Sequence, residues 1–210
     1  PFRTIIKNLL ENKLAMGGLI VFVSIFAMCF ILPIWFHQDL NYQDPTQKNI
    51  APGFSFLSVP SDLKDNAEVI EFGPTYGVGV DKDGYVYEWG QLTKNLKKIP
   101  ADMGKVVDIA VGQDHVLAIN DKGNLYTWGF NRMGLNVIPP ELKGKKIADI
   151  EAGYQVSVVV TEDGKVVSWG NTSAVDISTA NVKDEKVKEV KANIQTAIAL
   201  TKDGKVISLA

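Results

Sequence analysis

The 210-residue chain is close to neutral, with 22 basic and 24 acidic residues, but its charges are unevenly placed. The first 36 residues carry three basic and one acidic side chain, which leaves 19 basic and 23 acidic residues for the remainder. This balance excludes nucleic acid as an expected partner, because phosphate binding needs a clustered positive surface. A single cysteine, Cys29, excludes an intrachain disulfide, and His37 and His115 lack neighbours at the spacing of zinc ligands.

Residues 1–13 have the period of an amphipathic helix. Apolar side chains recur at intervals of three and four, and polar side chains occupy the other face. The apolar positions are Phe2, Ile5, Ile6, Leu9 and Leu10. Since an apolar tract follows directly, we expect a cytoplasmic helix in the membrane interface, the alternative being a short helix packed on a protein core.

Residues 14–36 contain no charged side chain, and about 20 apolar residues suffice to cross the hydrocarbon layer of a bilayer. Thirteen of them are Leu, Ile, Val or Phe, which contribute a gross insertion free energy of about −4 to −8 kcal/mol. A cleaved signal peptide has a shorter apolar core, and Met28 before Cys29 does not suit a lipoprotein signal. We therefore predict one transmembrane helix, with its N-terminus cytoplasmic because Arg3, Lys7 and Lys13 precede it.

Residues 37–66 are polar and rich in turn-forming residues, including Pro45, Pro52, Gly53 and Pro60, and they predict an extracellular linker loop. Three segments in order, NKLAMGGLIVF from Asn12, LPIW from Leu32 and NYQDPTQKNIAPG from Asn41, resemble the N-terminal region of the C-type permease subunits of bacterial oligopeptide and dipeptide ABC transporters. Those permeases continue into further spans, whereas this chain continues into repeats.

The permease resemblance implies a bacterial cell membrane protein with several partners. These are a second permease subunit, ATPase subunits and a substrate-binding lipoprotein, with a peptide as the substrate. ATP would be used by the partner subunits, so we expect no cofactor on this chain and no enzymatic activity of its own. The resemblance also implies that the intact protein continues beyond Ala210 into more spans.

Residues 67–210 repeat with a period of about 40 residues, which predicts a repeat architecture. The turn glycines are 39, 41 and 40 residues apart, and each supplies the positive φ of a tight hairpin. Each repeat predicts three strands, and residues 97–103 and 136–142 offer a fourth, outer strand. The fold class is therefore mainly β, a partial β-propeller of four-stranded blades. Its structural positions are Gly84, Trp89, Gly90, Gly123, Trp128, Gly129, Gly164, Trp169, Gly170 and Gly204.

The repeats are similar to those of the regulator of chromosome condensation family and of bacterial beta-lactamase inhibitor protein II. The second repeat carries most of the pattern, with Gly112, His115, Ala118, Gly123 and the pair Trp128–Gly129. That family's propellers have seven blades, but only about four repeats are present here. Either more repeats follow Ala210 or the ring closes in another way.

No residue pattern in the repeats requires catalysis or a metal. Asp81–Gly84 is explained by a hairpin turn better than by a calcium loop, and His115 is expected to be a hydrogen-bonding residue of a blade and not a catalytic base. The periodic tryptophans are expected in the blade cores rather than in a carbohydrate site. The predicted contact surface is the loop after the second Trp-Gly pair, made of Phe130, Asn131, Arg132 and Met133.

Two functions remain at this point. The leading hypothesis is a permease subunit of a peptide ABC importer, whose extracellular propeller docks the binding lipoprotein or limits access to the pore. The alternative is a signal-anchored surface protein whose propeller binds a protein or glycan and has no transport role. A GTPase exchange factor, which the repeat family suggests in eukaryotes, is disfavoured because the span directs the repeats outside.

Overall fold

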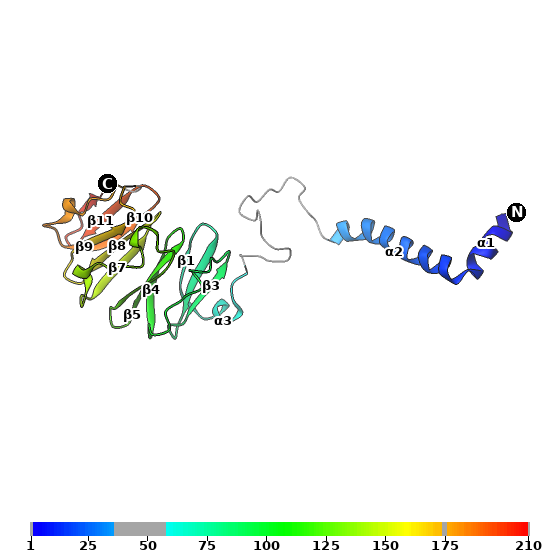
Figure 1. The fold of residues 1–210 in the computed structure, drawn as a ribbon, viewed down its shortest axis with the longest axis horizontal. Coiled ribbons are helices and arrows are strands. Elements are labelled where there is room, and N and C mark those ends of the chain that lie inside the picture. Colours follow the sequence, from blue (N-terminus) through cyan, green and yellow to red (C-terminus); the bar gives the residue numbers. More distant parts are fainter. Residues whose placement is uncertain (1, 36–57, 174–175, 210) are drawn as a thin grey trace. The chain divides into compact units, whose positions relative to one another are not determined.

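The computed structural model describes residues 2–35, 58–173 and 176–209. The chain divides into two compact units, residues 1–48 and 49–210 (Figure 1). Most of the predicted linker, residues 37–57, lies outside the described residues, as do Phe36 and Ala210.

Two helices form the described part of the first unit. Helix α1, Phe2–Glu11, has the predicted separation of apolar and polar faces. Helix α2, Lys13–Trp35, begins after Asn12, whose side-chain oxygen accepts hydrogen bonds from the backbone N–H groups of Leu14 and Ala15, both at 3.2 Å. An asparagine in this position pairs N–H groups that have no partner inside the helix.

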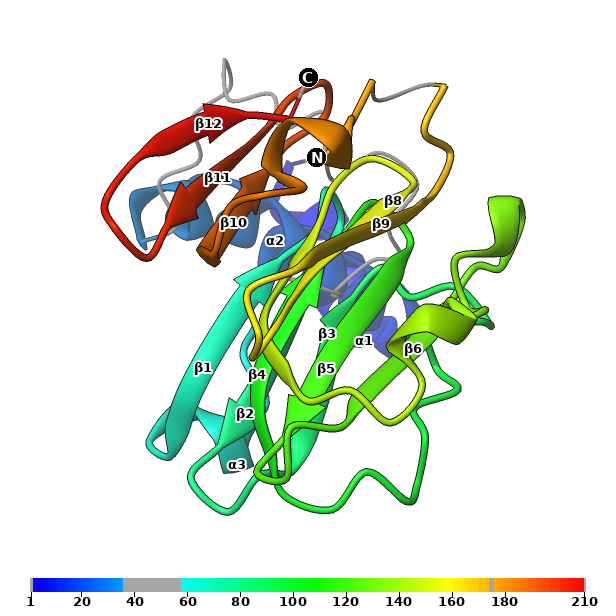
Figure 2. The same ribbon diagram turned by 90° about the vertical axis from the view of Figure 1, so that its left-hand side faces the viewer.

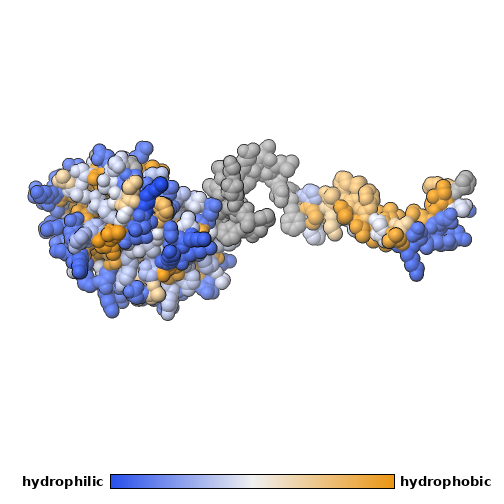
Figure 3. All heavy atoms as spheres, in the orientation of Figure 1, coloured by the Kyte–Doolittle hydropathy of each residue, from blue (hydrophilic) through white to orange (hydrophobic). Residues whose placement is uncertain are grey.

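Helix α2 is long and apolar enough to cross a membrane, and it is the one helix among the described residues that meets both criteria. None of its residues is buried against another part of the chain. Apolar residues cover it along most of its length (Figure 3). Pro33 lies in its last turn, where few backbone hydrogen bonds remain to be lost. This unit therefore has the character of a membrane anchor.

Four antiparallel sheets form the described part of the second unit, and each has three strands in sequence order (Figures 1 and 2). We number them sheets 1 to 4 along the chain. Sheet 1 contains β1 (Ala67–Phe72), β2 (Tyr76–Asp81) and β3 (Val86–Gly90). Sheet 2 contains β4 (Val106–Val111), β5 (His115–Asn120) and β6 (Leu125–Gly129). Sheet 3 contains β7 (Ile147–Ala152), β8 (Val156–Thr161) and β9 (Val166–Gly170). Sheet 4 contains β10 (Val187–Ala192), β11 (Ala197–Thr201) and β12 (Val206–Ser208).

The sheets are copies of one another in register as well as in order. The pairing of each first strand with the middle strand has an irregularity near the start of the first strand. In sheets 1 to 3 the tryptophan of the third strand lies opposite the second residue of the middle strand. Each hairpin turn glycine has a positive φ, from 74° to 90°. That backbone conformation is open to glycine at no steric cost, which is why the turn position recurs as glycine.

Neighbouring sheets pack face to face through three apolar clusters. We call the face toward the preceding sheet the leading face and the face toward the following sheet the trailing face. In the first cluster Val78 and Val80 of sheet 1 contact the leading face of sheet 2, where Ile109 and Trp128 lie. The same positions meet in the other two clusters, so the unit is a partial propeller with its core between the sheets.

The predicted fourth strand is wrong for the described residues. Residues 97–103 form turns and irregular backbone, and residues 136–142 end in the short 3-10 helix η3, Pro140–Leu142. Pro100 and Pro139 lack the N–H that a ladder of hydrogen bonds requires. The chain instead turns inward and buries Met103 or Leu142 in the cluster between two sheets.

A buried apolar side chain also precedes sheet 1. Helix α3, Ser61–Lys64, carries Leu63, which is fully buried and lies against Gly79 on the leading face of sheet 1. The segment VPSDL from Val59 matches IPADM and IPPEL ahead of sheets 2 and 3. The repeat pattern therefore extends into the last residues of the predicted linker, which the shared Pro-x-acid-apolar spacing signals.

Candidate functional site

The candidate contact surface lies where the turns between the first and second strands of each sheet meet. These turns approach one another closely, because a Cβ added at Gly73 would lie 2.9 Å from the Gly112 carbonyl oxygen, and one at Gly112 would lie 2.9 Å from that of Gly153. Glycine at these positions allows neighbouring backbones to touch. The turns therefore form one continuous end of the partial propeller.

The loop after β6 joins this end through the backbone. The Phe130 N–H donates to the Asp114 carbonyl oxygen at 2.8 Å, which ties the loop to the turn before β5. Phe130 and Met133 are exposed by 37% and 55%, and Met133 has a positive φ of 60°. The Arg132 guanidinium lies 5.8 Å from the centre of the Phe130 ring, within range of a cation–π contact.

Asn131 differs from the other three predicted contact residues. Its side-chain oxygen accepts a hydrogen bond from the Asn136 N–H at 2.9 Å, and the Asn136 side chain donates to the Gly129 carbonyl oxygen at 2.8 Å. Asn131 therefore braces the loop, whereas Phe130, Arg132 and Met133 present surface to a partner. Their role in binding stays a prediction.

Two residues near this loop were not predicted from the sequence to belong to the contact surface. Gln113 and Asp114 follow the turn glycine Gly112, and each has a buried side-chain oxygen without a partner among the described residues. Burial raises the pKa of the Asp114 carboxyl, and the positive charge of Arg132 opposes this rise. The signal for them was their position in the turn beside the predicted contact loop. The exposed Tyr154 occupies the position of Gln113 in the next repeat.

His115 is a structural residue. It is fully buried, and its Nε2 atom lies 3.1 Å from the Ser157 Oγ atom of sheet 3. Burial lowers the pKa of His115 to about 4, so the imidazole is neutral near pH 7. In the preceding repeat Tyr76 has this position and donates to the Gly112 carbonyl oxygen at 3.0 Å. Tyr76 therefore links sheet 1 to sheet 2, and His115 links sheet 2 to sheet 3, both from buried positions without access for a substrate.

The tryptophans are likewise part of the packing. Trp128 Nε1 donates to the Glu88 Oε1 atom of sheet 1 at 2.7 Å, and Trp169 Nε1 donates to the Leu135 carbonyl oxygen at 3.0 Å. The indole N–H groups of Trp128 and Trp169 thus reach an acceptor in the preceding repeat, whereas the buried Trp89 Nε1 has no hydrogen-bond partner among the described residues. Burial raises the pKa of Glu88 to about 7, and the hydrogen bond from Trp128 opposes this rise.

The opposite end of the unit carries the hairpin turns. The Asp81 carboxylate accepts hydrogen bonds from the N–H groups of Asp83 and Tyr85 at 3.0 and 2.9 Å, so the turn itself uses the oxygens that a calcium loop would offer. Among the described residues no group of three or more His, Cys, Asp or Glu side chains is arranged to hold a metal. The hairpin accounts for this sequence.

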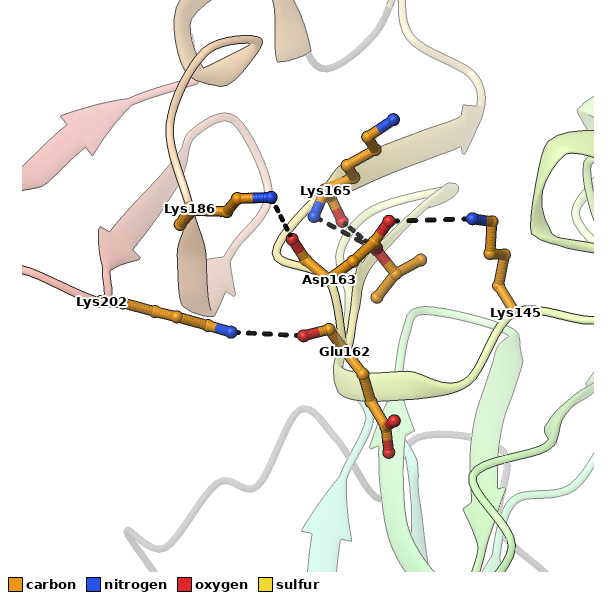
Figure 4. A network of polar contacts seen from close by, with 7 residues as sticks. Lys145, Glu162, Asp163, Lys165, Lys186 and Lys202 are labelled. Atoms are coloured by element: carbon orange, nitrogen blue, oxygen red, sulfur yellow. Dashed lines mark hydrogen bonds and ion pairs between the residues drawn. The ribbon is translucent and has the colours of Figure 1, made fainter.

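Lysines connect the hairpin turns of sheets 3 and 4 (Figure 4). Lys186 Nζ donates to the Asp163 carbonyl oxygen at 3.0 Å, and Lys202 Nζ donates to that of Glu162 at 3.2 Å. Lys145 Nζ lies 3.7 Å from the Asp163 carboxylate. These contacts are solvent-exposed, and such pairs contribute at most about 1 kcal/mol each. They connect the hairpin turn of sheet 3 to residues before and within sheet 4.

The arrangement of the four sheets defines a class of protein: the second unit is a partial propeller of the RCC1-like type. Residues 106–135 and 147–173 match the family model of the regulator of chromosome condensation (RCC1) repeat. Human WBSCR16 is a similar solved structure, with a TM-score of 0.57 and 19% identity over 68% of this chain and 46% of that chain. Prp20p from Saccharomyces cerevisiae has a TM-score of 0.53 and 21% identity over 68% of this chain and 45% of that chain.

The first unit matches a different family. Residues 1–52 match the model of the N-terminal TM domain of oligopeptide transport permease C. The two predicted resemblances are thus found in the two predicted parts of the chain.

The curated relatives share short stretches with the chain. Mouse serine/threonine-protein kinase Nek9 is 30% identical over 79 residues, 32% of this chain and 8% of that protein. Human E3 ubiquitin-protein ligase HERC2 is 31% identical over 151 residues, 57% of this chain and 3% of that protein. Because the chain spans so little of these relatives, their kinase and ligase activities do not transfer to it. The RCC1-like sheets and the permease-like segment are not catalytic in themselves.

Proposed function

We propose that this chain is the N-terminal part of a permease subunit of a bacterial peptide ABC importer, with an RCC1-like propeller in its first extracellular loop. The observation that carries the proposal is the match of residues 1–52 to the permease domain directly ahead of the repeats. The basic α1 and the apolar α2 support an anchor whose N-terminus is cytoplasmic. The propeller then lies outside the cell.

In this proposal the propeller is a docking or gating module. The substrate-binding lipoprotein of the importer is its partner, and the loop with Phe130, Arg132 and Met133 is the contact surface. Aromatic, arginine and methionine side chains are enriched in the cores of protein interfaces. ATP is hydrolysed by the cytoplasmic subunits, and this chain contributes to the path of the peptide.

Co-purification tests the proposal. The tagged chain is extracted from its own membranes in mild detergent, and its partners are identified by mass spectrometry. A second permease subunit and two ATPase subunits are expected. The matched control replaces residues 1–35 by an unrelated membrane anchor, which should lose these partners while the repeats stay intact. Purification of the native chain without them would contradict the transport role.

The alternative, a signal-anchored binding protein, is favoured by one observation: the repeats form their own core and do not need α2 for packing. A pull-down with Phe130→Ala and Met133→Ala separates the two functions. Loss of the lipoprotein supports docking, whereas loss of a different surface protein or glycan supports the alternative. Val137→Ala is the control, because Val137 is exposed to a similar degree outside the predicted contact residues.

Orientation is tested by labelling. With Cys29 replaced by serine, Tyr85→Cys introduces a thiol on an exposed hairpin turn. A membrane-impermeant maleimide should label it in intact cells, while Arg3→Cys should be labelled only after permeabilisation. Reversed labelling would overturn the extracellular placement of the propeller.

A further inference from the structure

A surface groove recurs at the same place beside sheets 1, 2 and 3, between the hairpin turn of the sheet and the segment that leads to the next sheet. The groove beside sheet 2 has a volume of about 530 Å³, against about 420 Å³ beside sheet 1 and about 400 Å³ beside sheet 3. We call it the sheet 2 groove; it is lined by Asn124, Leu125 and residues 138–140 and 142–145. Described sheets cover both faces of sheet 2, so this groove is not at an end of the partial propeller.

The floor of the sheet 2 groove is apolar and is held in place by the core. Leu125 and Ile138 are half-buried and pack against the cluster between sheets 2 and 3, and the buried Leu142 belongs to that cluster. Pro139 and Pro140 extend the apolar surface and carry no backbone N–H. A ligand can therefore place an apolar group on this floor without displacing the fold.

Positive charge lines one wall of the groove. Lys143 and Lys145 are exposed, and no acidic residue is among the lining residues. Lys143 has no ion pair among the described residues, whereas Lys145 Nζ lies 3.7 Å from the Asp163 carboxylate. Such an exposed pair contributes at most about 1 kcal/mol, so Lys145 is available to a second carboxylate. A Cβ added at Gly144, between the two lysines, meets no atom within 4 Å, so no described atom covers this part of the wall.

The equivalent grooves do not share this charge. In the next repeat, Asp184 and Glu185 stand at the positions of Gly144 and Lys145. Asp184 lines the groove beside sheet 3, and Asp83 lines the groove beside sheet 1. Among these three grooves of the described chain, the sheet 2 groove therefore has the largest volume and the only lining with basic and no acidic residues.

From these observations we infer that the sheet 2 groove binds the C-terminal end of a partner protein whose last residue is apolar. The terminal carboxylate lies at the wall with Lys143 and Lys145, where charge-assisted hydrogen bonds hold it, and the last side chain lies on the apolar floor. A chain terminus carries both groups on one carbon atom, which suits a basic wall that directly follows Leu142 of the floor in the chain. This inference does not depend on a role in transport.

The shape of the groove favours a chain terminus over a free fatty acid. Its volume is within the range of ligand sites, about 300–1,000 Å³. Leu142 is the one buried side chain of its lining, and the others are exposed or half-buried. An acyl chain needs an enclosed apolar cavity, whereas a protein terminus can extend from such a groove into solvent. Capture of a terminal carboxylate is a recurring mode of peptide recognition.

Peptide binding to the full chain in lipid nanodiscs tests the inference. The probe is a fluorescein-labelled hexapeptide that ends in leucine, and fluorescence polarisation measures its dissociation constant. Amidation of its C-terminus should weaken binding about tenfold, because two ion pairs with lysine are lost. Serine in place of the last leucine should weaken it to a similar extent, because the apolar side chain is lost. Absence of binding by the acid peptide, or equal binding by the amidated peptide, would overturn the inference.

Charge reversal locates the site. The combination Lys143→Glu and Lys145→Glu should weaken binding of the acid peptide about tenfold and leave binding of the amidated peptide unchanged, since the two lysines act on the carboxylate. Lys183→Glu, at an exposed position that lines the groove beside sheet 3, is the matched control and should bind as the native chain does. An equal loss in the control, or no loss in the double variant, would refute the sheet 2 groove as the site.

Two unlabelled competitors distinguish other carboxylates from a chain terminus. Hexanoate represents a free fatty acid, and an amidated peptide with aspartate before leucine represents an internal acidic segment. Neither should displace the probe at a concentration at which the unlabelled acid peptide does. Displacement by either competitor would overturn the assignment to a chain terminus.

Discussion

Glycines in helix α2 and glycines in the sheets have opposite surroundings. A Cβ added at Gly17 or Gly18 meets no atom within 4 Å. A Cβ added at Gly77 would lie 2.4 Å from the Trp89 ring, and one at Gly112 would lie 2.3 Å from the His115 ring. The surface of α2 is thus left for lipid or another protein, whereas the sheets are packed by their own neighbours.

The comparison extends to the sheets themselves. Inner junctions bury both faces, as at Leu117, while the outermost faces leave the same type of residue exposed, as at Ile198. A repeat protein gains much of its stability from the contacts between neighbouring units. The contribution of a side chain to the unfolding free energy therefore depends on how much of it the neighbouring sheet buries. Substitutions at equivalent positions should therefore differ in a predictable order.

The largest effect is expected for Leu117→Ala. Leu117 is fully buried between sheets 2 and 3, and truncating such a side chain costs about 2–5 kcal/mol of unfolding free energy. Ile198→Ala should cost about 0.5 kcal/mol or less, because Ile198 is 47% exposed. Urea unfolding followed by tryptophan fluorescence measures both. Equal losses would contradict the difference in burial between Leu117 and Ile198.

Gly112→Ala should have the next largest effect. The added methyl group overlaps the His115 ring and lies 2.9 Å from the Gly153 carbonyl oxygen, so we expect a loss of about 1–3 kcal/mol. Gly17→Ala in α2 is the matched control and should not change the unfolding of the sheets. A neutral Gly112→Ala variant would contradict the close approach of the turns.

A smaller difference separates Trp128→Phe from Trp89→Phe. Both lose the same volume, but only Trp128 gives up a hydrogen bond, to Glu88 at 2.7 Å. We expect Trp128→Phe to cost about 1 kcal/mol more than Trp89→Phe. Thermal unfolding followed by circular dichroism gives the two values. Equal losses in the two variants would contradict a stabilising role of the hydrogen bond between Trp128 and Glu88.

A further difference is expected in how the unfolding free energy depends on pH. The pKa of Glu88 is about 7 in the fold, above its ordinary 4.5, so the folded chain holds a proton that the unfolded chain releases. The stabilisation is complete below pH 4.5 and is lost as pH rises through 7. Glu88→Gln keeps an acceptor for Trp128 and should flatten the fall in unfolding free energy between pH 5 and 7. Glu141→Gln, on the surface, should leave the slope unchanged, and an unchanged slope in Glu88→Gln would refute the assignment.

Much of the fold followed from periodic residues. The turn glycines, the Trp-Gly pairs and the alternation of the middle strands predicted three strands in each repeat, and the structure has them. The fourth strand was wrong because residues 97–103 and 136–142 were interpreted by position, although Pro100 and Pro139 oppose strand pairing. Leu63 was missed because residues 59–63 were assigned to the linker, although they match residues 99–103 and 138–142 ahead of the next two sheets.

The candidate contact surface was harder to predict. Phe130, Arg132 and Met133 were predicted as contact residues from their residue types. The side chain of Asn131 instead accepts a hydrogen bond from the Asn136 N–H, five residues away, and so belongs to the loop itself. Asp114 joins the surface through a backbone contact to Phe130 that no spacing rule contains. Loop side chains take their direction from such contacts, so residue type alone does not separate a brace from a contact.

The sequence by itself determined the apolar helix, the length of the repeat and the hairpin turns, because each depends on local chemistry: the absence of charge, a period in the chain, or a glycine with positive φ. The tertiary structure alone decided which surfaces are covered. Ile70 and Ile109 have the same type and the same place in their strands, yet only Ile109 is buried. Burial is a property of the neighbouring sheet, and that neighbour is absent from the local sequence.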